Sequence, residues 1–451
     1  MLVLKFGGTS VGIPAHAERA LDIVCARLAH EPVVVVSALS GVTNTLVELC
    51  RGGVARDPLL ATLVERHVEH ARALGVPTAV VEPLLAELSA DAALATGEAL
   101  ARADRDRVLA YGERMAAALI SAALVKRGVP AHAVHAGEAG LVTDERFGQA
   151  HPLPEAPARL RAGFAARRGV PVVTGFIGCT ADGRTTTLGR GGSDYSAAYL
   201  GAALGAREIQ IWTDTSGMLS ADPRVVPEAR PVPRLSFAEA CELAYFGAKV
   251  LHPKTLLPAM ERGIAVRILN TARPDDPGSL ITADAEATEH GWRVKSIASK
   301  QGITAVTIAS TRMLLAHGFL ARVFEVFGRH HVVVDMVTTS EVSISVTVDD
   351  TSRLADALAE LETIGRVEVR TGLAVVAVVG EGAPTQVGLA GHVFTLLGGV
   401  GVPVEMISQG ASRVNLSFVV AESHAARVVR LLHRGLGLDV EVPAGEGVAQ
   451  G

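Results

Sequence analysis

The sequence is poor in aromatic residues, which make up only 4% of its 451 residues. Its cores must therefore be packed mainly from Ala, Val and Leu, as is typical of layered α/β proteins. Hydrophobic residues account for 49% of the chain, so the apolar surface available for burial is ample. A chain of this length and composition predicts two or three globular domains.

Cysteine is also scarce, and the four cysteines are far apart, without CxxC or zinc-ligand spacing. This distribution excludes a disulfide framework and predicts free thiols in a reducing cytoplasm. The histidines show no metal-ligand spacing with acidic residues either. We therefore expect no metal ion to be held by protein side chains alone.

The sequence also lacks a basic stripe and the pattern of a secretory signal peptide. The net charge is −5 with both signs interspersed, which makes nucleic acid and anionic membranes poor partners. Lys5 interrupts the first apolar run, so we expect no signal peptide. Residues 382–404 carry no charge, but their six glycines and two prolines predict turns around a helix rather than a membrane span. We expect a soluble protein.

Two glycine turns are present, although neither matches the P-loop or the dinucleotide-binding GxGxxG template. They are KFGGTS at residues 5–10 and GRGGSD at residues 189–194, each between an apolar strand and a predicted helix. Glycines let backbone amides approach a polyanion, and the helix N-terminus adds its positive dipole end. A single Gly-Gly before a helix is more often a structural turn. The pair, together with Lys5, Arg190 and Asp194, favours phosphate and carboxylate binding.

Residues 1–283 alternate between predicted strands and helices. The strands are expected at residues 33–36, 131–134, 170–176, 208–212 and 265–269, and residues 54–107 read as a helical insertion. Continuous apolar strands between helices predict an α/β fold, a three-layer αβα sandwich around a mainly parallel sheet. Ligands of such sheets bind at the carboxyl ends of the strands. Lys5, Ser37, Gly175, Thr213 and Asp214 are expected there.

After a Pro- and Asp-rich connector, the chain repeats itself at an offset of 70 residues. Val323-Phe324 matches Val393-Phe394, and Asp335-Met336-Val337 matches Glu405-Met406-Ile407. Two copies of this length predict two α+β, ferredoxin-like βαββαβ modules rather than a solenoid. The first contains an amphipathic helix at residues 319–331, with Leu320, Val323, Phe324 and Phe327 expected to point inward, and a strand at residues 332–337.

Further motifs accompany the glycine turns. They are SALSGVTN at residues 37–44, GER at 112–114, the run from Thr213 to Arg224, and FGAKVLHP at 246–253. Together these motifs resemble the amino-acid kinase family, specifically the lysine-sensitive, monofunctional aspartate kinases, essentially from end to end. The resemblance implies a catalytic domain at residues 1–283 and paired ACT domains, which are regulatory, at residues 297–372 and 373–442.

The resemblance also implies a role for individual residues. Lys5 and Asp194 would be catalytic, and Thr43, Glu113, Arg190 and Ser193 would bind the substrate. Nucleotide contacts would come from Lys5, Gly7, Gly8, Ser10, Thr213, Asp214, Leu219, Arg224, Lys249 and Val250. Leu219 departs from the tyrosine usual near this position and loses aromatic stacking. A lysine inside an apolar first strand is costly unless it is paired or meets a ligand.

The implied reaction transfers the γ-phosphate of ATP to the β-carboxylate of L-aspartate, with Mg²⁺ carried on the phosphates. That would be the first step of lysine, threonine and methionine synthesis. Asp194 is expected to orient Lys5 or to be an acceptor in the metal–phosphate network rather than to act as a base, because a free aspartate carboxyl, of pKa about 3.9, is already ionised. Two alternatives remain open: another carboxylate or carbamate kinase, such as acetylglutamate kinase, and a non-catalytic amino-acid sensor.

An effector site is implied around the first regulatory helix. Its residues would be Met313, Gly318, Phe319, Leu320, Val334, Asp335, Ser340 and Glu341. Acids suited to ammonium groups make L-lysine the expected effector, with L-threonine as the alternative and a feedback-resistant enzyme also possible. The resemblance further implies a homodimer or a dimer of dimers.

Overall fold

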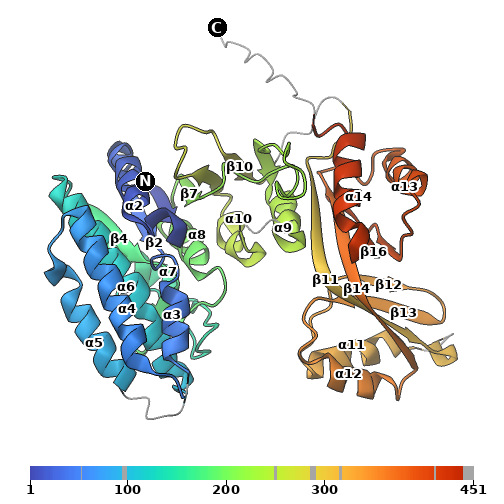
Figure 1. The fold of residues 1–451 in the computed structure, drawn as a ribbon, viewed down its shortest axis with the longest axis horizontal. Helices are drawn as coiled ribbons and strands as arrows, with labels where there is room; N and C mark the ends of the chain where they lie inside the picture. Colours follow the sequence, from blue (N-terminus) through green and yellow to red (C-terminus); the bar gives the residue numbers. More distant parts are fainter. Residues whose placement is uncertain are drawn as a thin grey trace, which may run out of the picture. The chain divides into compact units, whose positions relative to one another are not determined.

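The computed structural model describes residues 1–51, 53–93, 99–247, 251–284, 291–313, 317–410 and 413–439. These residues form two compact units (Figure 1). Unit 1 comprises residues 1–218, 233–237 and 249–285, and unit 2 comprises residues 219–232, 238–248 and 286–451. Two segments of the predicted catalytic range, residues 219–232 and 238–248, therefore lie in unit 2.

Unit 1 is built around an eight-stranded sheet with the order β3-β4-β2-β1-β7-β9-β10-β8. The strands are β1 (Leu2–Phe6), β2 (Val33–Val36), β3 (Ala131–Val134), β4 (Val170–Thr174), β7 (Glu208–Thr213), β8 (Arg234–Ser236), β9 (Ala265–Asn270) and β10 (Ser279–Thr282). All neighbouring pairs are parallel except β9 and β10. Every residue of β1, β2 and β4 is buried, as expected of strands covered on both faces.

Helices cover both faces of this sheet, which confirms the three-layer αβα sandwich. One layer consists of α2 (Pro14–Cys25), α3 (Val42–Leu49), α4 (Arg56–Leu74), α5 (Glu82–Ala93) and α6 (Arg102–Lys126), with α6 on β2, β3 and β4. The other contains α7 (Ala156–Ala165), α8 (Gly192–Leu204) and α10 (Leu257–Glu261). The helical insertion is confirmed by α4, α5 and the start of α6.

Shorter elements complete unit 1: the single-turn helix α1 (Gly8–Val11), the 3-10 turns η1 (Leu28–His30), η2 (Thr78–Val80) and η3 (Pro253–Thr255), and the hairpin of β5 (Ile177–Cys179) and β6 (Thr185–Thr187). Among the described residues, α6 alone is long and apolar enough to cross a membrane. In this structure 78% of its apolar window is buried, so α6 is a core helix of unit 1.

Unit 2 contains a six-stranded antiparallel sheet with the order β12-β13-β11-β14-β16-β15. The strands are β11 (Ser296–Ala309), β12 (Val337–Thr339), β13 (Ser343–Val348), β14 (Arg366–Val379), β15 (Met406–Ser408) and β16 (Asn415–Ala421). The helices are α9 (Phe237–Phe246), whose first residue belongs to unit 1, α11 (Phe319–Arg329), α12 (Leu354–Leu361), α13 (Leu389–Gly399) and α14 (Glu422–Gly435), with the short turn η4 (Thr311–Met313).

The two modules share the long strands β11 and β14. The start of β11 pairs with the end of β14, and the end of β11 pairs with the start of β14. Each module has its own core, one around α11 and α12 and one around α13 and α14. A division between residues 372 and 373 thus falls within β14.

Two local predictions in the first module were wrong. Residues 332–336 are not a strand, because β12 begins only at Val337. On α11, Val323 and Phe327 are buried, but Leu320 is 43% and Phe324 38% exposed. The buried face is completed instead by Phe319 and Val326, at the i, i+4, i+7, i+8 spacing of a single helical stripe.

Candidate active site

The first glycine turn joins the end of β1 to α1. The amide of Gly7 donates to the carbonyl oxygen of Trp212 at 3.2 Å, which holds the turn against the end of β7. The buried Ser10 hydroxyl donates to the same oxygen at 3.1 Å and lies 2.7 Å from the Thr271 hydroxyl. A Cβ on Gly8 would lie 2.9 Å from the Ala38 carbonyl oxygen. Glycine is therefore required for this close approach.

The second glycine turn lies between β6 and α8, as the sequence predicts. Gly189 and Gly191 have φ values of 78° and 70°, the left-handed region that glycine adopts without strain. Helix α8 begins at Gly192, where a Cβ would lie 2.6 Å from the ring of Phe176. Phe176 itself has a φ of 68°, a strained value for a bulky residue.

A cavity of about 250 Å³ lies between these two turns, at the carboxyl ends of β1, β2 and β4. Its lining comprises Lys5, Ser37, Thr43, Glu113, Phe176, Gly189, Gly191, Gly192, Ser193 and Asp194. The Lys5 ammonium lies 2.5 Å from a carboxylate oxygen of Asp194, and both side chains are largely buried. Five of the six residues predicted to be catalytic or substrate-binding are thus brought together.

Glu113 gives the cavity a buried carboxyl group. Gly112 precedes it on α6 and lets the helix approach Ala38, since a Cβ on Gly112 would lie 2.7 Å from the Ala38 Cβ. The Ala38 amide donates to Glu113 Oε1 at 3.1 Å, while Oε2 has no hydrogen-bond partner. Burial raises the pKa of Glu113 to about 8, against the opposing effects of the Ala38 amide and Lys5. An ammonium group beside Oε2 would restore the ionised form.

Arg190 is the one residue predicted to bind the substrate that lies outside the lining of this cavity. Its side chain is exposed and does not line the cavity. Thr43 lies in the first turn of α3, whose N-cap is Gly41 in the left-handed region. The roles assigned to Arg190, Thr43 and Ser193 stay predictions.

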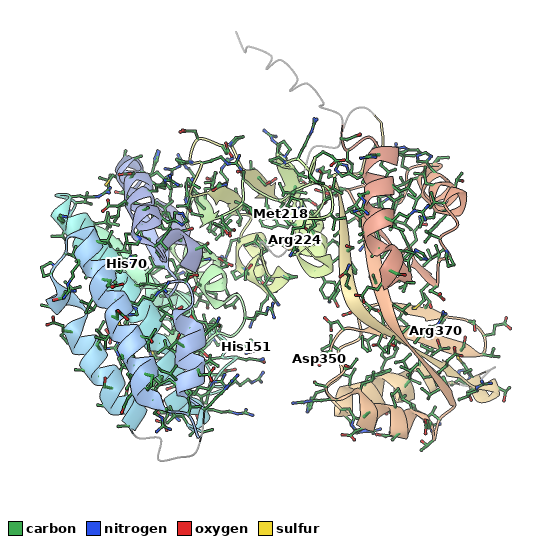
Figure 2. The ribbon with its side chains drawn as sticks, viewed as in Figure 1. His70, His151, Met218, Arg224, Asp350 and Arg370 are labelled. Carbon is green, nitrogen blue, oxygen red and sulfur yellow. The ribbon has the colours of Figure 1, made fainter. Side chains whose placement is uncertain are left out.

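The predicted nucleotide residues fall into two groups. Thr213 ends β7 and Asp214 follows it, and because β7 pairs with β1 both lie beside the first glycine turn in unit 1. Leu219 and Arg224 lie in unit 2, where Arg224 forms an exposed ion pair with Asp222 at 2.5 Å (Figure 2). Lys249 and Val250 are outside the described residues. These nucleotide assignments also stay predictions.

Asp106 is a residue of α6 that the sequence did not single out. Its buried carboxylate accepts hydrogen bonds from the Gly148 amide at 2.8 Å, the Thr187 amide at 2.7 Å and the Thr187 hydroxyl at 3.0 Å. It thereby holds the end of β6, from which the second glycine turn begins. Its only sequence signal is an acid between apolar helix positions, which surface aspartates also show.

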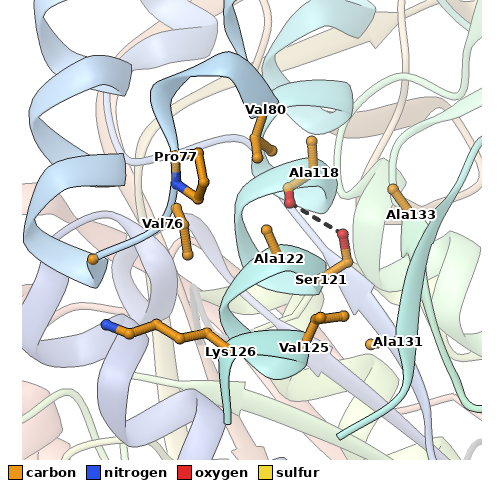
Figure 3. Close-up of a pocket in the computed structure, with 11 residues that line it drawn as sticks. Val76, Pro77, Val80, Ala118, Ser121, Ala122, Val125, Lys126, Ala131 and Ala133 are labelled. Atoms are coloured by element: carbon orange, nitrogen blue, oxygen red, sulfur yellow. Dashed lines mark hydrogen bonds between the residues drawn. The ribbon is translucent and has the colours of Figure 1, made fainter. Parts of the chain in front are cut away.

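A larger hollow lies between η2, α6 and β3 (Figure 3), with a volume of about 500 Å³. Its walls are apolar apart from Ser121 and Lys126. The Ser121 hydroxyl donates to the Ala118 carbonyl, and the Lys126 ammonium donates to the Leu74 carbonyl at 2.9 Å. This hollow therefore lacks the converging charges that phosphate binding requires.

The predicted effector residues surround the start of α11 and the β12–β13 turn in unit 2. Met313, Gly318, Phe319 and Leu320 precede or begin α11, and Val334, Asp335, Ser340 and Glu341 flank β12. Glu341 is exposed, whereas the Asp335 side chain is only 2% exposed. Burial and neighbouring Asp349 raise the pKa of Asp335 to about 7.

No group of three or more His, Cys, Asp or Glu side chains suited to a metal ion occurs among the residues that the structure describes. Asp194 lies in the first turn of α8, and Asp214 follows β7, which pairs with β1. Such a donor set suits Mg²⁺ that keeps most of its ligands from phosphates and water.

Comparison with known proteins gives consistent matches. The model of the amino acid kinase family matches residues 1–270, and the ACT domain model matches residues 306–363 and 376–436. The lysine-sensitive aspartokinase 3 of Escherichia coli K12 is 39% identical over 455 residues, covering 97% of this chain and 99% of that protein. Chloroplastic aspartokinase 1 of Arabidopsis thaliana is 37% identical over 454 residues, covering 96% and 79%.

Solved structures match over the same extent. The crystal structure of E. coli aspartokinase III in complex with aspartate and ADP (R-state) has a TM-score of 0.85 and 38% identity, covering 97% of this chain and 99% of that one. The complex of the same enzyme with lysine and aspartate (T-state) has a TM-score of 0.79 and 37% identity, with equal coverage.

Proposed function

Since this chain belongs to the aspartokinases of the amino acid kinase family and is a phosphotransferase, we propose that its unit 1 cavity binds ATP and L-aspartate and transfers the γ-phosphoryl group to give 4-phospho-L-aspartate and ADP. The observation that carries this assignment is the Lys5–Asp194 pair at 2.5 Å beside the buried Glu113 carboxyl group. A cation for phosphate and an acid for an ammonium thus line one small cavity. Its position at the carboxyl ends of parallel strands is where such folds bind ligands.

In this proposal a β-carboxylate oxygen of aspartate attacks the γ-phosphorus. The bond between that phosphorus and the β,γ-bridging oxygen breaks, and ADP leaves. No proton has to be removed from the nucleophile, because a free aspartate carboxyl, of pKa about 3.9, is ionised at neutral pH. Asp194 is therefore assigned to holding Lys5, and Lys5 with the glycine-turn amides stabilises charge on the transferred group.

Mg²⁺ would be held mainly by the ATP phosphates, where it supplies further charge neutralisation. Asp194 and Asp214 are the protein carboxylates placed to contact it or its waters. Glu113 receives the α-ammonium of aspartate, which satisfies its unpartnered oxygen. Thr43, Ser193 and Arg190 are assigned to the carboxylates of the substrate, and the exposed Arg190 reaches it by a change of side-chain rotamer.

A hydroxamate assay with aspartate and ATP tests the reaction. Lys5→Ala should lower kcat by roughly 10²–10³, the usual cost of losing one preorganised electrostatic contact. Lys126→Ala is the matched control, since its ammonium binds the Leu74 carbonyl away from the cavity. Turnover of N-acetylglutamate but not of aspartate would assign the chain to a different acceptor. Near-native turnover in Lys5→Ala would remove Lys5 from the mechanism.

The same assay separates the two substrates. Arg190→Ala should raise the KM for aspartate while leaving the KM for ATP nearly unchanged. A loss of ATP binding in this variant would instead place Arg190 on the nucleotide.

The proposed regulation is feedback inhibition by L-lysine, with L-threonine as the alternative, in a homodimer or dimer of dimers. The solved complex of the E. coli relative with lysine supports the choice of effector. Exposed Leu320 and Phe324 on α11 support an interface between regulatory modules. We place the enzyme in the cytoplasm, at the first step of lysine, threonine and methionine synthesis, in keeping with its four free cysteines.

Activity measured against increasing L-lysine tests this regulation in the wild type, Asp335→Ala and Glu341→Ala. Both variants should need more lysine for half-inhibition. Inhibition unchanged in both would place the effector site elsewhere. Light scattering during size-exclusion chromatography should give at least twice the mass of one chain, and a monomer would contradict the proposed assembly.

A further inference from the structure

The buried carboxylate of Asp335 already has partners from its own chain. The Tyr245 hydroxyl on α9 donates to Oδ1, and the Lys300 ammonium on β11 lies 3.6 Å from Oδ2. The same ammonium lies 2.7 Å from Asp349 and 4.4 Å from the centre of the Tyr245 ring. All four residues belong to unit 2. The acid assigned to an effector ammonium thus has an internal ammonium beside it, while its Oδ2 atom has no hydrogen-bond partner.

The second module repeats this ion pair in a different environment. The 70-residue offset relates Lys300 to Arg370 and Asp335 to Glu405. Arg370 binds both oxygens of Glu405, with Nη2 at 2.9 Å from Oε1, and these side chains are 53% and 22% exposed (Figure 2). Lys300 and Asp335 are 22% and 2% exposed.

This difference in burial and geometry affects how firmly each carboxylate is held. A bidentate arginine is a specific, fixed partner, whereas a lysine is a point charge on a flexible stem. Lys300 is also shared between two carboxylates. An unpaired buried carboxylate is costly, so Lys300 leaves the ionised Asp335 most easily when another cation takes its place.

We propose that Lys300 and Tyr245 belong to the effector site; this inference rests on the proposed inhibition by L-lysine. Lys300 competes with the effector ammonium for Asp335, and Tyr245 links Asp335 to α9. An effector ammonium reaches Asp335 by replacing the Lys300 ammonium, which conserves the charge of the buried cluster. Because the Tyr245 hydroxyl donates to the same carboxylate, the exchange also perturbs a hydrogen bond that joins α9 to the segment before β12. Effector affinity is then set by a competition between two ammonium groups.

The chain after α9 runs from unit 2 to unit 1. Gly247 lies against β11 with a φ of 139°, and a Cβ there would lie 2.4 Å from the Ser299 carbonyl oxygen. In unit 1, His252 packs on the second glycine turn, since a Cβ on Gly191 would lie 3.1 Å from the His252 Cβ. Gly247 and His252 are five residues apart in the sequence, so α9 and the second glycine turn are neighbours along the chain. The proposed link from Tyr245 to the kinase follows this connection along the chain.

Substitutions of opposite effect at Lys300 test the competition. Lys300→Met removes the competing ammonium, so Asp335 is always available to the effector. The L-lysine concentration for half-inhibition should therefore fall by roughly tenfold, because apparent affinity rises with the fraction of binding-competent protein. Lys300→Arg should raise it, because a bidentate arginine would hold Asp335 as Arg370 holds Glu405. Arg370→Met is the matched control on the second module and should behave as the wild type. A folding defect cannot produce opposite shifts.

Tyr245→Phe separates binding from inhibition. Calorimetry should show L-lysine bound at least as tightly as by the wild type, while the maximal inhibition, relative to the uninhibited rate of the variant, decreases. The inference alone is overturned if the wild type is inhibited but Lys300→Met needs the same or more lysine. It is also overturned if Tyr245→Phe is inhibited like the wild type. Absence of lysine binding in the wild type and in all variants would overturn the proposed regulation as well.

Discussion

Single side chains in the unit 1 cavity owe their chemistry to burial. Lys5 and Asp194 are common surface residue types, but at the end of β1 and the start of α8 they are shielded from water and paired at 2.5 Å. Glu113 is 3% exposed and keeps one oxygen without a partner. Burial therefore disfavours the ionised form of Glu113, and a cationic substrate group would offset that cost.

This burial predicts a pH-dependent KM for aspartate. Because the pKa of Glu113 is about 8 in the empty cavity, the group is mostly protonated at pH 7 and must lose its proton to accept an ammonium. The KM for aspartate should fall, by at most about tenfold per pH unit, between pH 6 and 8 and then level off. Glu113→Gln should show a higher, pH-independent KM, with the KM for ATP unchanged.

The same group predicts the sign of a stability change. Folding raises the pKa of Glu113 from about 4.5 to about 8. The contribution of this group to the free energy of unfolding is therefore fully present below pH about 4.5 and is lost as the pH rises through about 8. Without substrates, Glu113→Gln should therefore gain melting temperature relative to the wild type at pH 8.5, and less at pH 5. An equal difference at both pH values would mean that Glu113 does not titrate in this range.

Helix α6 is the element that assembles the cavity. Through Asp106 it holds the end of β6, through Gly112 it approaches Ala38, and through Glu113 it lines the site. Arg114, on the same helix, donates to Glu87 of α5 at 2.8 Å. Its long apolar face, which by length alone could span a membrane, instead serves as the central packing surface of one helical layer.

Close packing of α6 makes Gly112 a sensitive position. Gly112→Ala should cost about 1–3 kcal/mol of stability, as overpacked cores do, and should raise the KM for aspartate by shifting Glu113 from the Ala38 amide. Gly391→Ala in α13 is the matched control, because nothing lies within 4 Å of a Cβ there. It should be neutral or slightly stabilising. Equal effects of the two substitutions, by thermal melting and kinetics, would contradict the packing argument.

At the scale of the whole molecule, chain order and compact units do not coincide. Residues 219–232 and 238–248 leave unit 1 and return to it, and Ala221 and Val226 pack in the core around α13 and α14. Helix α9 is fixed there by Glu239, which lies 2.9 Å from the buried Lys295 ammonium and accepts the Glu381 amide at 2.7 Å. Unit 2 thus includes a segment that contains two of the predicted nucleotide residues, Leu219 and Arg224.

Two cores predict two calorimetric unfolding transitions. Glu239→Gln leaves Lys295 buried beside a neutral group, so it should lower the stability of unit 2 by about 3–5 kcal/mol. Aspartate with ADP should raise the other transition, since ligands stabilise the unit that binds them. One transition that moves as a whole under both changes would show a single cooperative unit. Asp222→Asn, which alters an exposed ion pair of unit 2, should leave both transitions nearly unchanged.

The sequence by itself determined the elements of unit 1 and the residues at the ends of its strands. Buried parallel strands appear as continuous apolar runs such as residues 33–36, and glycine turns before helices are visible as local motifs. Lys5 and Asp194 could be selected because charge inside an apolar strand or beside a glycine turn needs a ligand, whereas Glu113 was selected by the resemblance of its Gly-Glu-Arg motif. These signals lie within a few residues of one another in the chain.

The tertiary structure alone decided which distant groups meet. Tyr245, Lys300 and Asp335 come from three separate elements, so their cluster has no local pattern, and Asp335 looked like an open acid until packing buried it. The strained backbone of Phe176 is likewise imposed by its neighbours. Leu320 and Phe324 are exposed because the neighbouring stripe of α11 faces the sheet. The spacing of apolar residues along the helix does not distinguish two stripes that are offset by one residue. Burial is a property of the folded whole, and it distinguishes these acids and cations from the same residue types on a surface.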